Sequence, residues 1–438
     1  MKKVQPSQKT VGIYGFVVLC SIFFFVYLHR VATAALAPDL MQDFSTTATE
    51  LGVLSSMYFY AYALMQIPAG LLVDSIGSRK TATFFTTITA IGILLFGLAQ
   101  TLLIASIARL IIGIGVSVIF VATVKILARW FRPDEVSSYF GIFVLVGNLG
   151  AIAAAAPLAL VTLTIGWRLT FGFLAIIAAI QVGFAWMIIR DAPKEEEQPQ
   201  PRDPRPQQNH VTIEVQPGRP QLLDRFKKIA RDRLIAKMAA IVFVTYGTLI
   251  AFQGLWGVPY LMQVYQLTKI EASYLITVIA VGFCVGAPLF GYLSDKVFCA
   301  RKPIVRAGVL LYTLMWIPLA LRTTNLSKEL HFALFFGLGF FHGAIPIAIT
   351  MIKETVEERT IGLAVGYMNI YPMLGIAIFQ PLIGWILDTV DPVKNSDPSS
   401  IPALGYATAF QFCLCCLILV SVVSLTLQET FLKPEELS

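Results

Sequence analysis

The chain contains twelve long apolar segments, and this feature constrains its fold more than any other. A helix needs about 20 apolar residues to cross a bilayer. Only 13% of the 438 residues are charged and 57% are hydrophobic, which excludes soluble, disordered, nucleic-acid-binding and disulfide-stapled proteins. We therefore predict an all-α membrane protein with twelve transmembrane helices. The predicted spans cover 11–28, 51–73, 81–99, 101–124, 136–160, 169–189, 238–263, 272–294, 307–321, 330–352, 360–387 and 405–428.

Residues 191–233 divide the spans into two sets of six. This segment is rich in proline and charged residues and cannot bury a core. It is predicted to be a cytoplasmic linker between an N-terminal bundle (1–190) and a C-terminal bundle (234–438). Its last part, Leu222 to Arg233, is predicted to form a basic amphipathic helix that lies on the membrane surface.

Basic residues are distributed unevenly between the two sides of the predicted bundle. If the N-terminus is inside, most of the 33 Lys and Arg residues lie in inside segments. The basic composition is then an orientation signal and not a nucleic-acid footprint. Both termini are expected in the cytoplasm, and the short loops suggest a bacterial inner membrane. The outside loops hold only Arg168, Lys269, Arg322, Lys328 and Lys394.

The two halves of the chain are similar in sequence. At an offset of 221 residues, Pro38 and Asp74 of the first half match Pro259 and Asp295 of the second. A duplicated six-helix unit is typical of transporters whose halves rock about a central site. Further matches pair Glu50 with Glu271, Gly70 with Gly291 and, at an offset of 225, Gly141 with Gly366 and Gly150 with Gly375.

Two inside loops carry the same short motif. The loop after the second span reads Gly-Leu-Leu-Val-Asp-Ser-Ile-Gly-Ser-Arg-Lys at 70–80, and the loop after the eighth reads Gly-Tyr-Leu-Ser-Asp-Lys at 291–296. Together with Arg109-Leu-Ile-Ile-Gly-Ile-Gly115 in the fourth span, these segments resemble the signature motifs of the major facilitator superfamily. The resemblance extends over the whole chain and implies two pseudo-symmetric six-helix bundles that work by alternating access.

We expect the two motif loops to form a latch between the halves when the inside is shut. Their glycines would allow close helix packing and a tight turn. Asp74 would lie near the start of a neighbouring helix, whose dipole favours a carboxylate. The alternative is a plain positive-inside signal. The predicted gating residues are Gly70, Asp74, Arg79, Lys80, Gly291, Asp295 and Arg301.

The first span also resembles the organophosphate:phosphate antiporter family. The segment Tyr27-Leu-His-Arg30, with Pro38 eight residues further on, carries this resemblance. It implies that Arg30 holds the anionic group of a substrate. The chain departs from that family at Ala251, where a second arginine is expected, and at Gly147, where a histidine is expected. One of three anion-binding groups is therefore present.

Polar groups inside the spans are the candidate substrate contacts. Arg30 comes first because a guanidinium pairs with a carboxylate in bidentate fashion. The alternative is that Arg30 lies near the outer end of the first helix and extends to the interface. His29 and His342 could titrate near neutral pH, so each could carry a proton or only form a hydrogen bond. The predicted substrate site is His29, Arg30, Tyr58, Tyr62, Asn148, Tyr246, Gln253, Trp256, His342, Asn369 and Tyr371.

These features predict a secondary transporter, and not an enzyme, that moves a small organic anion such as a carboxylate, amino acid or short peptide. A proton or another ion would drive symport. The sequence has neither a phosphate-binding loop of the ATPase type nor a metal-ligand pattern, so no cofactor, metal or nucleic acid is expected. A monomer in the bilayer is expected. Two alternatives remain: a multidrug or metabolite efflux carrier, suggested by Arg109, which could also be structural, and a transporter-like membrane sensor.

Overall fold

The computed structural model describes residues 8–192, 227–357, 360–390 and 403–431. Within these ranges the chain is helical, with short connections and no strand. Eleven helices are long and apolar enough to cross a membrane, and one bent pair makes a twelfth span. The predicted all-α membrane fold with twelve spans is therefore confirmed.

The first half contains six spans, two of which are interrupted. The fourth span runs through Leu102–Trp130, and the fifth bends by 42° between Ser138–Ala153 and Ala156–Ile165. The elements of the first half are α1 (Gln8–Phe44), α2 (Ala48–Ile76), α3 (Ser78–Gly97), α4 (Leu102–Val116), α5 (Ile119–Trp130), α6 (Pro133–Ala153), α7 (Ala156–Ile165) and α8 (Trp167–Ile188).

The second half repeats this plan with two π-helical turns. One turn interrupts the seventh span and the other ends the eighth. Its elements are α10 (Arg233–Ala251), η2 (Phe252–Trp256), α11 (Gly257–Tyr265), α12 (Lys269–Tyr292), η3 (Leu293–Val297), α13 (Lys302–Leu321), α14 (Lys328–His342), α15 (Ile347–Thr355), α16 (Ile361–Val390) and α17 (Ala403–Leu425).

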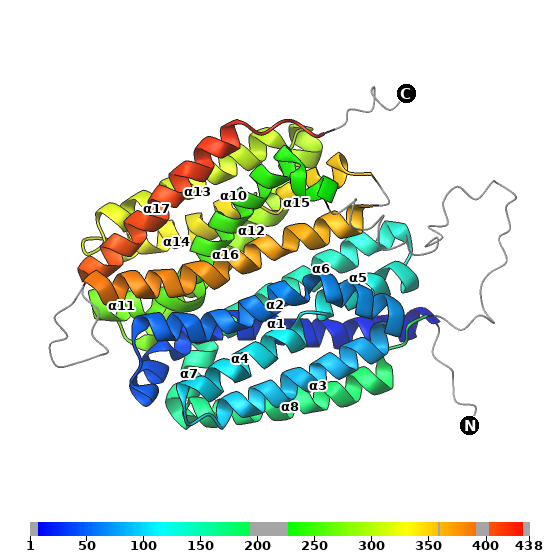
Figure 1. The fold of residues 1–438 in the computed structure, drawn as a ribbon, viewed down its shortest axis with the longest axis horizontal. Helices are drawn as coiled ribbons and strands as arrows, with labels where there is room; N and C mark the ends of the chain where they lie inside the picture. Colours follow the sequence, from blue (N-terminus) through cyan, green and yellow to red (C-terminus); the bar gives the residue numbers. More distant parts are fainter. Residues whose placement is uncertain (1–7, 193–226, 358–359, 391–402, 432–438) are drawn as a thin grey trace, which may run out of the picture.

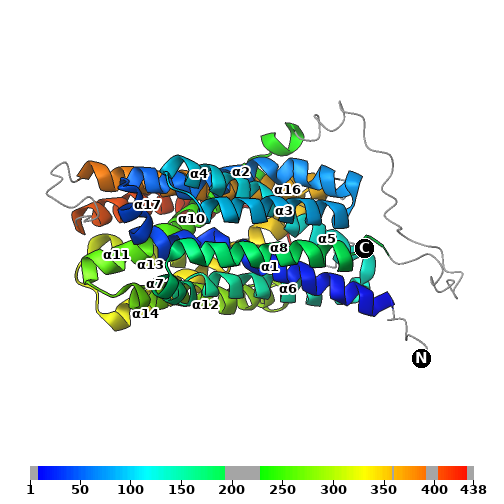
Figure 2. The ribbon, with the colours of Figure 1, turned by 90° about the horizontal axis from the view of Figure 1, so that it is seen from below.

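The two halves lie side by side and meet along α2 and α16 (Figure 1). Figure 2 shows α1 running along α6 and α8. We call the end of the bundle where α8 ends and α10 begins the linker end. The opposite end, where α1 ends and α2 begins, is the far end.

The internal repeat is visible in the helix caps. The hydroxyl of Thr47 accepts the backbone N–H of Glu50 at the start of α2, and the glutamate accepts the N–H of Thr47 in return. Thr268 and Glu271 form the same capping box at the start of α12. The two boxes are 221 residues apart, which is the offset of the repeat in the sequence.

The halves also share a close helix crossing. An added Cβ at Gly150 would lie 1.9 Å from the carbonyl oxygen of Phe24, and one at Gly375 would lie 2.1 Å from that of Phe243. Only glycine fits at such a distance. Small residues therefore bring α6 onto α1 and α16 onto α10, as is common between helices in membranes.

The first helix is longer than the sequence pattern predicts. The apolar run was expected to end at residue 28, where His29 and Arg30 interrupt it, but α1 continues to Phe44. The segment that follows is rich in alanine, and both polar residues are buried by neighbouring helices. Arg30 therefore lies within the bundle and does not extend to the interface.

The described part of the predicted surface helix packs against protein. Residues 227–231 form a short helix, in which Ile229 is buried and Lys228 pairs with Glu357 at 2.8 Å. The predicted helix is present over these residues and packs one residue against protein, and its place on the membrane surface stays a prediction. Residues 222–226 lie outside the described ranges.

Substitution of Gly375 by alanine is expected to destabilise the protein strongly. The new methyl group would force α16 away from the backbone of α10, and overpacking of this kind costs about 1–3 kcal/mol. The measurement is the apparent melting temperature in detergent. The control is Gly366→Ala in the same helix, where an added Cβ has no described atom within 4 Å. Equal melting temperatures for the two variants would contradict the proposed close crossing.

Candidate functional site

Arg30 lies between the two halves of the protein. Its side chain is 9% exposed, and the ring of Tyr27 lies 4.4 Å from the guanidinium carbon, measured to the ring centroid. The ring of Tyr62, from α2, lies 5.7 Å away. Tyr58 and Tyr246 are close enough to interact electrostatically with the same guanidinium. Arg30 is thus surrounded by four phenol groups, one of which comes from the second half.

This cation has no anionic partner among the described residues. None of the ion pairs found in those residues includes Arg30, and its Nε is buried without a hydrogen-bond partner. A buried charge is costly unless it is paired. Stacking on the rings of Tyr27 and Tyr62 offsets only a part of this cost. An anion at this position would complete the site.

Arg109 has a structural contact. Its Nη1 donates to the carbonyl oxygen of His29 at 2.8 Å, and its guanidinium lies 5.0 Å from the ring centroid of Tyr58. Arg109 is 1% exposed. It therefore ties α4 to α1 next to Arg30, which favours the structural role that the sequence left open.

The two candidate histidines lie in different surroundings. His29 is buried in the first half, where its ring is 5.9 Å from that of Phe171 in α8. His342, at the end of α14, packs edge-on against Tyr246 at 4.4 Å between ring centroids. Neither imidazole has a hydrogen-bond partner for its nitrogens among the described residues. The ring of His342 contacts Tyr246, which is one of the four tyrosines around Arg30.

The π-helical turn η2 lies against the backbone of Arg30. An added Cβ at Gly254 would lie 3.7 Å from the carbonyl oxygen of Arg30. π-turns inside helices are frequent at functional sites. In the same turn Gln253 is nearly buried, whereas Trp256 is fully buried and donates to the backbone oxygen of Gln380 at 3.0 Å. Trp256 therefore contributes to packing between η2 and α16.

The remaining predicted site residues are less closely linked to Arg30. The amide of Asn148 donates to the carbonyl of Val144 in its own helix at 2.9 Å. The hydroxyl of Tyr371 donates to that of Tyr367, one turn away in α16. Asn369 is half-buried in the same helix. No described contact joins these three residues to Arg30.

Tyr27 is not among the predicted site residues, although its position in the sequence contains a signal. It precedes Arg30 by three residues, and residues at this spacing lie on the same face of a helix. Lys269 and Asp388 were also not expected to connect the halves, because that role depends on which helix ends meet in space.

Asp388, near the end of α16, caps the N-terminus of α2. Its carboxylate accepts the backbone N–H groups of Ala48 at 3.1 Å and Thr49 at 2.7 Å, and the Thr49 hydroxyl at 2.5 Å. A carboxylate at this position satisfies free N–H groups and is favoured by the helix dipole. The cap joins the halves at the far end.

Lys269, at the start of α12, makes a second connection at the far end. Its Nζ lies 2.5 Å from a carboxylate oxygen of Asp39 in α1 and 3.0 Å from the hydroxyl of Thr162 in α7. The lysine side chain is 6% exposed, so solvent screens this pair less than a surface pair.

At the linker end, the charged residues of the first motif loop bind within their own half. Asp74 pairs with Lys125 at 2.8 Å. The backbone N–H of Arg79 donates to Asp191 at 2.9 Å, and the Arg79 side chain donates to the carbonyl oxygen of Trp186. None of these interactions crosses to the second half.

The second motif loop is tied to helix α15 and to the C-terminal segment. Arg301 pairs with Asp295 and, at 3.0 Å, with Glu354. Glu429 accepts the backbone N–H groups of Arg301 and Lys302. Burial raises the pKa of Glu429, but these N–H donors outweigh burial and hold its pKa below the usual value.

Gly70 and Gly291 make no close helix contact in this arrangement of the halves, since an added Cβ at either would have no described atom within 4 Å. Their role in a latch with the inside shut stays a prediction. The tight turn expected of the motif glycines is made by Gly77, whose φ of 91° favours glycine. Lys80 is exposed next to this turn.

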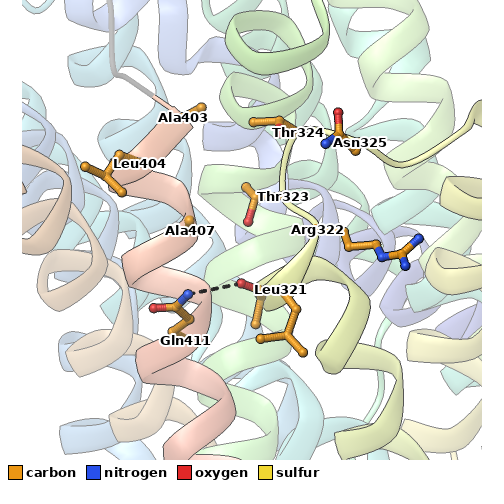
Figure 3. A pocket seen from close by; sticks show the side chains of 10 residues that line it. Leu321, Arg322, Thr323, Thr324, Asn325, Ala403, Leu404, Ala407 and Gln411 are labelled. Atoms are coloured by element: carbon orange, nitrogen blue, oxygen red, sulfur yellow. Dashed lines mark hydrogen bonds between the residues drawn. The ribbon is translucent and has the colours of Figure 1, made fainter.

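A pocket lies elsewhere, between the end of α13 and α17 (Figure 3). It is lined by Arg322, Thr323 and Asn325, among others, and Gln411 on its wall donates to the carbonyl of Ala320 at 3.3 Å. Ala403, also in its wall, follows residues 391–402, which are outside the described ranges. We therefore do not take this pocket as the substrate site.

Comparison with known proteins identifies the family. The Major Facilitator Superfamily profile matches residues 18–256 and 238–436. The chain belongs to this superfamily. Most of the relatives that the chain matches are named as transporters, and the chain is a multi-pass membrane transporter and not an enzyme. The narrower resemblance to organophosphate:phosphate antiporters stays a prediction.

Individual relatives are distant but cover most of the chain. The hexuronate transporter of Bacillus subtilis is 24% identical over 83% of this chain and 85% of its own length. The probable galactarate/D-glucarate transporter GarP of Escherichia coli is 22% identical over 87% of this chain and 90% of its own length. The structure of a bacterial homologue of the lysosomal transporter Spinster, inward-facing and unoccupied, matches with a TM-score of 0.72 and 18% identity over 94% of this chain and 96% of that one. The structural match supports the two-bundle fold.

Replacement of Asp388 by alanine is expected to favour opening at the far end. Loss of a helix cap costs about 1 kcal/mol, which shifts a two-state population about fivefold. The measurement is the distance distribution between spin labels at Gln100 and Thr324, which are exposed on opposite halves at the far end.

The matched control is Asp232→Ala, which removes the cap of α10 within one half. This control should lower thermal stability and leave the distance distribution unchanged. Identical distributions for Asp388→Ala and the wild type would rule out the cap as a far-end connection.

Proposed function

We propose that this transporter moves a small hydroxylated carboxylate of the sugar-acid type, with Arg30 as the anchor for the carboxylate. The observation that carries the proposal is the buried guanidinium of Arg30, which has no carboxylate partner among the described residues. A carboxylate matches the paired N–H donors of a guanidinium. The phenol groups of Tyr27, Tyr62 and Tyr246 suit the hydroxyl groups of such a substrate.

The relatives support this substrate class. Two of them are named for hexuronate and for galactarate and D-glucarate, which are carboxylates that carry several hydroxyl groups. A dianionic phosphate is a poorer fit, since the position of the second arginine in phosphate carriers is Ala251, which is fully buried here. One guanidinium would leave part of the phosphate charge unpaired.

The proposed cycle exchanges contacts at the two ends of the bundle. With the linker end in the cytoplasm, this structure is closed at the far end by Asp388 and Lys269. When the far end opens, the motif residues Asp74 and Arg79 are free to exchange their present partners for groups on the other half. His29 and His342 are the candidates for a coupling proton, since no aspartate or glutamate lies mid-span in the described helices.

Binding of sugar acids to the purified protein tests the proposal. Glucuronate, galacturonate and glucarate are compared with glucose 6-phosphate and a lipophilic cation by thermal shift. A ligand at 100 times its dissociation constant stabilises by about 2.7 kcal/mol. Arg30→Gln should lose this shift, since removing one partner of a buried charge pair costs about 2–5 kcal/mol. Arg322→Gln, an exposed arginine, is the control.

Counterflow of labelled ligand in proteoliposomes then separates transport from sensing. Accumulation that depends on Arg30 supports the proposal. The proposal would be overturned if the wild type bound no sugar acid, or if the Arg30→Gln variant bound the sugar acids as tightly as the wild type. Binding without counterflow would instead indicate a sensor, and stabilisation by the cation alone would indicate an efflux carrier.

A further inference from the structure

Gly147, in α6, faces two aromatic rings of α1. An added Cβ at this position would lie 2.7 Å from Cε1 and 2.9 Å from Cδ1 of Phe23, and 3.2 Å from Cδ2 of Tyr27. The first two distances are shorter than atoms tolerate. Any side chain at residue 147 would therefore have to displace Phe23 and press on Tyr27.

Phe23 has little freedom to move away. Its ring stacks on that of Phe143 at 3.8 Å between centroids, and Phe143 is fully buried. The ring of Phe23 also contacts that of Tyr27, at 5.0 Å between centroids. Interiors packed in this way transmit displacements, so a shift of Phe23 would reach Tyr27.

We propose that Gly147 and Tyr27 are positioning residues that make the Arg30 site selective for a planar carboxylate over a tetrahedral phosphate. Gly147 leaves the room that lets the Tyr27 ring lie over the Arg30 guanidinium at 4.4 Å. The inference rests on the proposed function, in which Arg30 anchors the anion.

In this proposal the Tyr27 ring covers one face of the Arg30 guanidinium, an arrangement that the 4.4 Å between the guanidinium carbon and the ring centroid allows. The N–H donors then stay at the edge of the guanidinium and are directed within its plane. Both oxygens of a carboxylate lie in that plane and pair with two donors. A phosphate can place two oxygens there, but its third oxygen then points out of the plane, on one side toward the ring face of Tyr27. An aromatic face is electronegative and does not donate a hydrogen bond, so this oxygen stays unpaired.

The test compares two anions built on the same sugar ring. Carbon 6 of glucuronate is the carboxylate carbon, whereas glucose 6-phosphate carries its phosphate on the oxygen of carbon 6, and isothermal titration gives both dissociation constants. We expect the wild type to prefer glucuronate by at least about tenfold. Tyr27→Leu, which removes the ring, and Gly147→Ala, which displaces it, should each reduce this preference to about threefold or less.

Matched variants distinguish a loss of Tyr27 positioning from a general loss of stability. Gly141→Ala lies in the same helix as Gly147, and an added Cβ there has no described atom within 4 Å, so the preference should stay unchanged. Tyr27→Phe keeps the ring but removes a hydroxyl that is proposed to contact both sugars, so both dissociation constants should rise together and their ratio should stay. Phe23→Leu makes room, so it should restore the preference in the Gly147→Ala background. If Gly147→Ala does not fold, the ratio of dissociation constants measured for Tyr27→Leu decides the test.

The outcomes distinguish this inference from the proposed function. A wild type that binds glucuronate, with an unchanged preference in both Tyr27→Leu and Gly147→Ala, would overturn the inference and leave the function standing. A wild type that prefers glucose 6-phosphate would also overturn it. A wild type that binds no sugar acid would overturn the proposed function, and the inference with it.

Discussion

The centre of this structure depends on the positive charge of Arg30. A guanidinium in the middle of a membrane span is costly in contact with lipid, so the helix that carries it has to be enclosed. Helix α1 is enclosed by α6 and α8 of its own half and by the π-turn η2 of the other. The tyrosine rings near the guanidinium reduce the cost of burial but supply no negative charge. The proposed carboxylate ligand would bring one.

Close helix crossings make this enclosure possible. Gly150 and Gly375 allow backbones to touch in the two halves, and Gly147 allows aromatic rings to fill the space next to Arg30. Hydrophobic attraction contributes little between helices in lipid, so contact at short range is a main source of cohesion. Each half can then act as a packed unit that moves relative to the other.

The contacts between and within the halves are arranged unevenly along the bundle. At the far end, Asp388 and Lys269 each connect one half to the other. At the linker end, the described partners of Asp74, Arg79 and Arg301 belong to the same half as the residue itself. Because the far-end contacts have to break before the halves can separate there, they favour the arrangement that is closed at the far end.

The sequence by itself determined the twelve spans, the duplicated half and its helix caps, because these depend on local hydropathy and on residues a few positions apart. It also indicated Arg30, since an intramembrane charge is visible in any apolar run. The length of α1 was missed, because only neighbouring helices make burial of His29 and Arg30 tolerable. Tertiary structure alone decided that Tyr27 covers Arg30, that Gly147 makes room for it, and that Asp388 caps a helix 339 residues away. These contacts depend on which helix faces meet in space, and a single sequence does not contain that information in its local pattern.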